Sequence, residues 1–168
     1  IAKPKVSANI EKSVKSTFNV GPVCADDFKA GEGIKKCRVI KTIKNELLTK
    51  EELREINFDL NGGTDVKNDI LKIAVIERHK HTGHKAVGFI SGLGLKKGAL
   101  ASSVSHDSHN IVAVGTNTHN MLDISRAFPL APKFFSRTGP KAGAPLFYTD
   151  FQTFPIHIRQ CKNITGIC

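Results

Sequence analysis

The densest polar chemistry of this sequence lies in one pentad, His106-Asp107-Ser108-His109-Asn110. An imidazole can move protons near neutral pH, and a carboxylate can orient the ring or accept its proton. Two short apolar runs, Ala99 to Val104 and Ile111 to Val114, flank the pentad and have the composition of strands. The pentad is therefore expected at a strand end or turn, where neighbouring side chains can be presented together.

Within the pentad, His106 and Asp107 are the candidate catalytic pair, as a proton relay or as groups that orient a substrate. The residues expected to support them at a substrate site are Glu77, His79, Ser108, His109 and Asn110. A structural interpretation stands beside this one: Asp107 and Asn110 can tie the turn together through side-chain to backbone hydrogen bonds. The sequence leaves both interpretations open.

Histidines also gather upstream of the pentad, and together with it they offer the ligand types that zinc and similar metals prefer. Histidines on turns are more often solvated or hydrogen-bonded to the backbone, so no metal site is expected in this chain. If one existed, its ligands would come from His79, His81, His84 and His109.

The elements that must position these residues are mostly strands. Lys36 to Asn45 alternates basic and apolar residues, which suits a half-buried strand. Ile70 to Glu77 is an apolar run, which implies burial on both faces, and Ala86 to Ile90 is a further strand. Gly92 to Gly98 lacks the spacing of nucleotide-binding glycine loops and predicts a tight turn.

Two helices are expected. Thr49 to Ile56 begins with a threonine followed three residues later by a glutamate, a helix-start signal. Thr118 to Phe128 can wind as a short amphipathic helix, capped by Thr118. Strands followed by a covering helix indicate an α/β or α+β fold: a single domain with a mixed β-sheet and few covering helices.

The chain divides into three parts by composition. Residues 1–20 are polar and rich in Lys and Ser and predict a linker or irregular segment, and residues 21–128 form the domain. Residues 129–168 are rich in Pro, Gly and Phe without clean periodicity, which predicts a diverged, fused or frameshifted tail.

The composition also limits the classes of binding partner that we expect for this chain. The formal net charge is +10, but Lys and Arg are spread along the chain, with one Tyr and no Trp, which argues against nucleic acid as a partner. No apolar run approaches the roughly 20 residues that span a bilayer, and the first residues lack a signal core, so a cytoplasmic protein without a membrane partner is expected. A homo-oligomer is compatible with the sequence.

Several strings resemble, in the same order, the C-terminal domain of the bacterial adenine deaminases of the amidohydrolase superfamily. They are Ile73 to His79, Gly92 to Ala99, Ala101 to Val104, the pentad, and Val114 to Asn117. The resemblance covers the middle of the chain well, the part before Asp69 loosely, and the part after Arg126 hardly at all. Cytidine and tRNA deaminases instead use His-x-Glu with Pro-Cys-x-x-Cys, and neither motif occurs here.

The resemblance implies a hydrolase of adenine catabolism, part of purine metabolism, that converts adenine to hypoxanthine and ammonia with manganese, iron or zinc. It implies that these metals lie in a barrel domain preceding the matching region, in the same or a companion chain. A barrel needs about 250 residues, so this chain alone is expected to hold no cofactor and to be inactive. Assembled with a barrel, it would place the pentad near the adenine site.

Two other functions remain open. The chain could be a free-standing binding or assembly module that uses the fold without chemistry. It could also be a basic nucleic-acid-binding protein, for which steep salt dependence of RNA binding would be the signature.

Overall fold

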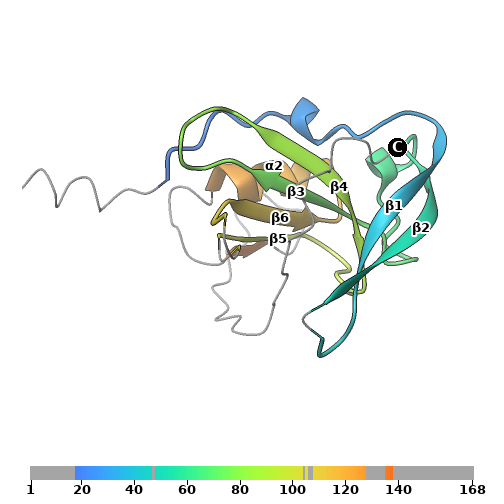
Figure 1. Ribbon diagram of the computed structural model, residues 1–168. Helices are drawn as coiled ribbons and strands as arrows, with labels where there is room; N and C mark the ends of the chain where they lie inside the picture. The colour runs from blue at the N-terminus through green and yellow to red at the C-terminus, as the bar shows by residue number, and fades with distance from the viewer. Residues whose placement is uncertain (1–17, 47, 104, 106–107, 128–134, 138–168) are drawn as a thin grey trace, which may run out of the picture.

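The computed structural model describes residues 18–46, 48–103, 105, 108–127 and 135–137. Within these residues, one sheet has the strand order β2-β1-β4-β3-β6-β5-β7 (Figure 1). The elements in chain order are η1 (Ala25–Phe28), β1 (Ile34–Thr42), β2 (Thr49–Asn57), η2 (Asn61–Gly63), β3 (Leu71–Ile76), β4 (Lys85–Ser91), β5 (Ala99–Ser102), β6 (Ile111–Gly115), α2 (Thr118–Ala127) and β7 (Phe135–Arg137).

The sheet is mixed, and one short parallel seam makes it so. The pairs β1/β2, β3/β4, β3/β6, β5/β6 and β5/β7 are antiparallel. Strand β1 joins β4 in parallel through three residue pairs, from Val39 opposite Phe89 to Lys41 opposite Ser91. The expected single domain, with a mixed sheet and few covering helices, is confirmed as an α+β fold.

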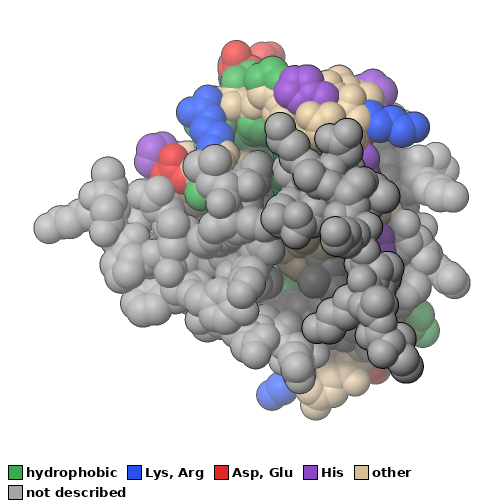
Figure 2. Space-filling view, turned by 90° about the vertical axis from the view of Figure 1, so that its left-hand side faces the viewer, with side chains coloured by type: hydrophobic (Ala, Val, Ile, Leu, Met, Phe, Trp, Pro, Cys, Tyr) green, Lys and Arg blue, Asp and Glu red, His purple; other side chains and the backbone are tan. Residues whose placement is uncertain are grey.

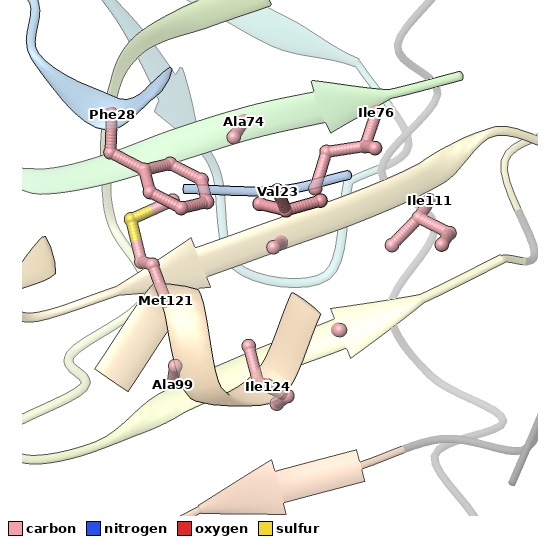
Figure 3. Close-up of a cluster of buried hydrophobic side chains, with 10 residues drawn as sticks. Val23, Phe28, Ala74, Ile76, Ala99, Ile111, Met121 and Ile124 are labelled. Atoms are coloured by element: carbon pink, nitrogen blue, oxygen red, sulfur yellow. The ribbon is translucent and has the colours of Figure 1, made fainter. Parts of the chain in front are cut away.

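Strand β3 is buried on both faces, as its apolar run predicts. Leu71 and Ile73 point to one face, with Ile90, Val112 and Val114. Ala74 and Ile76 point to the other face, which α2 covers (Figure 3). The buried cluster under α2 comprises Val23, Phe28, Ala74, Ile76, Ala99, Ala101, Ile111, Ala113, Met121 and Ile124.

Helix α2 confirms the helix expected near residue 118 but not its cap. The Asn117 side-chain oxygen accepts a hydrogen bond from the backbone N–H of Asn120 at 2.8 Å, which is the N-cap geometry. Thr118 is instead the first helical residue, and its hydroxyl lies 3.4 Å from the Lys72 ammonium. Met121 and Ile124 are fully buried against the sheet, so the helix has the amphipathic character that its sequence predicts.

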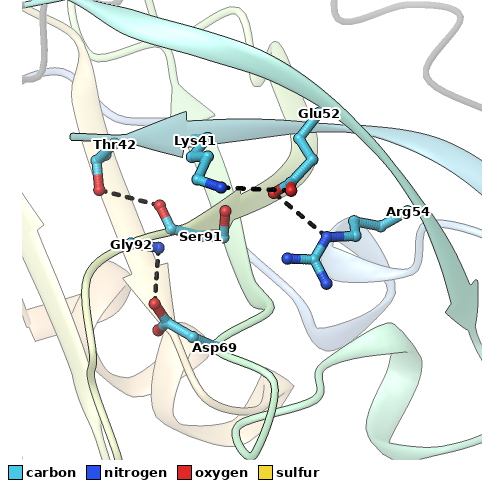
Figure 4. A network of polar contacts seen from close by, with 7 residues as sticks. All are labelled: Lys41, Thr42, Glu52, Arg54, Asp69, Ser91 and Gly92. Atoms are coloured by element: carbon cyan, nitrogen blue, oxygen red, sulfur yellow. Dashed lines mark hydrogen bonds and ion pairs between the residues drawn. The ribbon is translucent and has the colours of Figure 1, made fainter.

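The helix expected from Thr49 to Ile56 is wrong, because this stretch is strand β2. All nine of its residues pair with β1 in antiparallel register. From Glu51 to Ile56 burial alternates with a period of two, and Ile56 is buried while Leu53 is 55% exposed. Glu52 lies 3.4 Å from Lys41 across the ladder (Figure 4). The local helix-start signal is outweighed by this non-local pairing.

The tight turn expected from Gly92 to Gly98 begins beside the parallel seam. Asp69 accepts hydrogen bonds from the backbone N–H group of Gly92 at 2.7 Å (Figure 4) and from that of Gly94 at 2.8 Å. Gly92 has φ +91°, and a Cβ there would lie 2.4 Å from the Thr42 carbonyl oxygen. A side chain at this position would therefore force β1 and the turn apart.

The ends of the chain fall mostly outside the described residues. This applies to the linker expected at 1–20, of which 18–20 are described, and to the tail expected at 129–168, of which only β7 is described. Phe18 and Val20 pack against the cluster under α2. In the described part of the chain, neither the length nor the apolarity of any helix would suffice to cross a bilayer.

Candidate functional site

Two turns meet at one end of the sheet. The first, residues 77–84, connects β3 to β4, and the second, residues 103–110, connects β5 to β6 and contains the pentad (Figure 1). Because β3 and β6 are antiparallel neighbours and Ile76 lies opposite Ile111, the end of β3 is beside the start of β6. The pairing thus brings the histidines after β3 to the pentad.

A direct contact joins the two turns. The His79 Nε2 atom lies 2.9 Å from the backbone carbonyl oxygen of Ser108. Since a carbonyl oxygen can only accept, Nε2 must carry the proton. This contact fixes the tautomer of His79 and ties the pentad to the preceding turn.

The Glu77 carboxylate organises the first turn. It accepts hydrogen bonds from the backbone N–H groups of His79, Lys80 at 2.8 Å and Thr82 at 3.2 Å, and from the Thr82 hydroxyl at 3.0 Å. Burial by itself raises the pKa of Glu77, but these hydrogen bonds outweigh it and lower the pKa to about 2. Glu77 is therefore ionised near neutral pH and positions the backbone rather than exchanging protons.

The two turns also share an unusual backbone conformation. His81 has φ +56° and His109 has φ +50°, in the left-handed region that residues with a side chain seldom adopt. Backbone hydrogen bonds hold both residues, from His81 N–H to the Asn19 carbonyl at 3.0 Å and from His109 N–H to the Ser105 carbonyl at 2.7 Å. Backbone contacts thus hold both turns in addition to the side-chain hydrogen bonds.

Inside the pentad turn, serine hydroxyls add side-chain contacts to the backbone hydrogen bond of His109. Ser105 Oγ and Ser108 Oγ lie 3.0 Å apart, and the backbone N–H of Asn110 donates to Ser108 Oγ at 3.4 Å. Ser105 is buried, while Ser108 and His109 are exposed. His106 and Asp107, the candidate catalytic pair, lie outside the described residues.

Sequence reasoning missed two residues of this region, Ser105 and Arg78. Serine is frequent in turns and Ser105 directly precedes the pentad, so Ser105 could have been found. The Arg78 guanidinium carbon lies 4.3 Å from the centre of the Phe18 ring, a cation–π contact, and Asn19 N–H donates to the Arg78 carbonyl at 2.6 Å. Burial lowers the pKa of this guanidinium, and among the described residues its buried Nε has no hydrogen-bond partner. The N-terminal segment and the first turn are therefore locked together beside the site.

The described residues do not fit a metal ion. No three His, Cys, Asp or Glu side chains among them lie close enough together to hold one. The Glu77 oxygens and His79 Nε2 are already hydrogen-bonded to the protein. Figure 2 shows histidine side chains at several separate places on the face in view. His81, His84 and His109, the other candidates, are exposed at the surface.

Comparison with known proteins gives a consistent match. Residues 46–127 match the family model described as the adenine deaminase C-terminal domain. Adenine deaminase from Desulfatibacillum aliphaticivorans is 51% identical over 96 residues, covering 56% of this chain and 16% of that protein. Adenine deaminase from Petrotoga mobilis is 40% identical over 117 residues, covering 68% of this chain and 20% of that protein.

A third relative, adenine deaminase from Methanothrix thermoacetophila, is 42% identical over 113 residues, which is 65% of this chain and 20% of that protein. The chain thus spans about a fifth of the length of the curated relatives it matches. Both turns of the candidate site lie inside the matched range. The stretch 46–127 of this chain belongs to the adenine deaminase C-terminal domain family.

Proposed function

We propose that this chain supplies the C-terminal domain of an enzyme that hydrolyses adenine to hypoxanthine and ammonia. In this reaction water adds to the ring carbon that bears the amino group, and that amino group leaves as ammonia. The proposal is supported by the family of residues 46–127 and by relatives that carry the name adenine deaminase. A cytoplasmic enzyme of purine catabolism would follow from it.

We expect the metal of this reaction to be bound outside the residues described for this chain. The resemblance implies manganese, iron or zinc, which would activate the attacking water. Because the described residues bring no set of metal ligands together, we assign the metal to a barrel domain in the same or a companion chain. This chain alone would then bind neither the metal nor adenine productively.

The role proposed for this domain is to present the pentad to the adenine site. The observation that carries it is the 2.9 Å contact between His79 Nε2 and the Ser108 carbonyl, next to a turn organised by the Glu77 carboxylate. Such a support holds a loop in one geometry, as a proton relay requires. His106 and Asp107 would act on the substrate, while Ser108, His109 and Asn110 shape the turn that carries them.

The test is a chimaera in which this chain replaces the matching region of the Desulfatibacillum aliphaticivorans relative. We expect the chimaera, loaded with manganese, iron or zinc, to form hypoxanthine well above a metal-only blank, and the isolated chain to remain at the blank. Turnover by the isolated chain would contradict the assignment of the metal to another domain. An inactive but folded chimaera would contradict the proposed function.

Variants of the chimaera then separate a catalytic from a structural pentad. Replacing His106 by Ala or Asp107 by Asn should lower kcat by roughly 10²- to 10⁴-fold with an unchanged melting temperature. His119→Ala is the matched control, because His119 is exposed on α2 and pairs with Asp123 at 3.3 Å. Loss of folding in the pentad variants would favour the structural interpretation.

A further inference from the structure

The N-terminal segment, residues 18–23, lies along the first turn, although 60 residues separate Asn19 from His79 in the chain. The Asn19 N–H donates to the Arg78 carbonyl at 2.6 Å, and the Asn19 carbonyl accepts from the His81 N–H at 3.0 Å. Figure 1 shows the start of this segment, in blue, beside that turn at one end of the sheet. Asn19 therefore fixes the backbone of the first turn on both sides of His79.

A pair of glycines brings the segment and the turn into direct backbone contact. A Cβ at Gly21 would lie 2.8 Å from Gly83 Cα and 2.9 Å from Gly83 N, closer than real Cβ atoms approach backbone. Gly21 is buried at this contact. Any larger residue at position 21 would therefore push the segment away from the first turn.

The same segment is anchored to the core at both of its ends. Val23 is 8% exposed and belongs to the cluster under α2 (Figure 3). Its carbonyl accepts two hydrogen bonds from Arg126, from Nε at 3.0 Å and from Nη2 at 2.9 Å. Phe18 and Val20 pack against the same cluster. Because these contacts join the segment to α2 and the sheet, the segment can hold the first turn in place rather than follow it.

The first turn carries the contact to the pentad turn. His79 lies between the two residues that Asn19 binds, and its Nε2 donates to the Ser108 carbonyl at 2.9 Å. Ser108 precedes His109, whose N–H donates to the Ser105 carbonyl at 2.7 Å. A shift of the first turn would move His79 and change the support of the Ser108 carbonyl. A continuous path of contacts thus leads from the N-terminal segment to the pentad turn.

We propose that the N-terminal segment, residues 18–23, positions the candidate site. It fixes the first turn, and through His79 it holds residues 108–110 in the geometry that turnover requires. This inference rests on the proposed function of the domain. Asn19 and Gly21 are positioning residues, because they act through His79 and not on the substrate. Loosening the segment should therefore lower kcat more than it raises KM.

The first test is amide hydrogen exchange in the full chain, measured by nuclear magnetic resonance. In Gly21→Ala the His109 amide should exchange roughly tenfold faster than in the parent, whereas the amides of Ala113 and Val114 in β6 should keep their rates. Asn19→Pro removes the N–H that binds the Arg78 carbonyl and should act in the same way. Asn19→Ala keeps both backbone hydrogen bonds and is the matched control, in which His109 should be protected as in the parent.

A double-mutant cycle tests whether the coupling passes through His79. His79→Ala removes the contact with the Ser108 carbonyl and should by itself speed exchange of the His109 amide. In that background Gly21→Ala should add less than about twofold, because the path is already broken. An effect of Gly21→Ala that is as large without His79 as with it would overturn the proposed path.

The second test measures turnover in the chimaera described above. Gly21→Ala and Asn19→Pro should lower kcat roughly 10- to 100-fold and change KM by less than about threefold, while His119→Ala keeps the parental values. If circular dichroism shows that these variants do not fold, Phe18→Leu is the milder variant. It keeps an apolar side chain against the cluster under α2 and removes the ring that faces Arg78, so His109 should exchange about threefold faster.

Three results would overturn the proposal. They are folded variants in which His109 exchanges as in the parent, variants in which His109 and the β6 amides lose protection together, and folded variants with the parental kcat. The exchange measurement needs no turnover, so it decides the coupling by itself. A parent chimaera that is folded but inactive would overturn the proposed function instead.

Discussion

Each end of β3 has a charged side chain, and the surroundings disfavour the charged form at one end and favour it at the other. Lys72, near its start, is only 1% exposed, and its ammonium donates to the Phe28 carbonyl at 2.8 Å and to the Thr118 hydroxyl at 3.4 Å. No ion pair joins it to an acid among the described residues. Glu77, directly after β3, is partly exposed and accepts four hydrogen bonds from the turn it organises.

The pKa of both side chains is lowered, but a lower pKa disfavours the charged form of a lysine and favours the charged form of a glutamate. Burial lowers the pKa of Lys72 to about 8, which disfavours its charged form. At Glu77, burial raises the pKa, and hydrogen bonds lower it further than burial raises it, to about 2, which favours its charged form. Charge therefore opposes folding at one end of β3, where burial decides the pKa, and supports it at the other, where hydrogen bonds outweigh burial.

The largest expected effect comes from removing the Glu77 charge. Glu77→Gln leaves the Thr82 N–H facing an amide NH₂ and should lower the free energy of unfolding by about 2–4 kcal/mol at pH 7, measured by urea denaturation. The folded pKa of about 2 lies below the ordinary 4.5. The parent should therefore lose stability as pH falls from about 4.5 towards 2. A variant with unchanged stability would mean that these hydrogen bonds do not hold the turn.

The next effect is an alkaline gain in stability from Lys72. Its folded pKa of about 8 lies below the ordinary 10.5, so the unfolded chain keeps the proton at pH values where the folded chain has lost it. The free energy of unfolding should rise between about pH 8 and 10.5 by up to roughly 3 kcal/mol. Lys72→Met should remove this rise, whereas Lys50→Met, at an exposed position on β2, should keep it. A rise that persists in Lys72→Met would assign it to another group.

A smaller effect is expected from removing one of the hydrogen bonds to Glu77, at the end of β3. Thr82→Val removes the hydroxyl that donates to Glu77 at 3.0 Å but leaves the Thr82 backbone N–H in place. We expect a loss of about 1 kcal/mol and a folded pKa of Glu77 that is raised relative to the parent. Chemical-shift titration of the carboxyl carbon would measure the pKa. A loss as large as that of Glu77→Gln would indicate that the hydroxyl carries most of the contribution.

The smallest effect is expected from removing one hydrogen-bond partner of Lys72, near the start of β3. Thr118→Val removes the acceptor at 3.4 Å and leaves the Phe28 carbonyl as the partner of the ammonium. Because a partner of the charged form is lost, the pKa of Lys72 should fall further, and the alkaline rise should begin at lower pH. The loss of stability at pH 7 should be about 0.5 kcal/mol. A rise displaced to higher pH would contradict the assigned geometry.

The part of the fold that could be predicted from sequence is the part with local periodicity. The spacing of apolar residues in β3 and in α2 indicates which of their side chains are buried. Strand β2 could not be recognised, because Thr49 and Glu52 have helix-start spacing and the alternation that decides its structure appears only against β1. The cap of α2 lies one residue before the expected position, since Asn117 and Thr118 are both good caps.

The site could be predicted as a set of residue types but not as an arrangement. The pentad and His79 were recognisable, yet their contact depends on β3 and β6 being neighbours, which no local pattern encodes. The contact between Arg78 and Phe18 likewise joins segments far apart in the chain. The Glu77 carboxylate binds backbone groups, and backbone donors carry no sequence signal.

The parallel seam between β1 and β4 has a consequence for the order in which the protein opens. The hairpin of β1 and β2 is joined to the rest of the sheet by three residue pairs, from Val39 opposite Phe89 to Lys41 opposite Ser91. Strand β3, in contrast, has six residue pairs with β4 and five with β6. Local opening follows the weakest connection. Amide hydrogens of β1 and β2 should therefore exchange with solvent as one cooperative unit, at a lower free energy than those of β3 and β6, which report global unfolding.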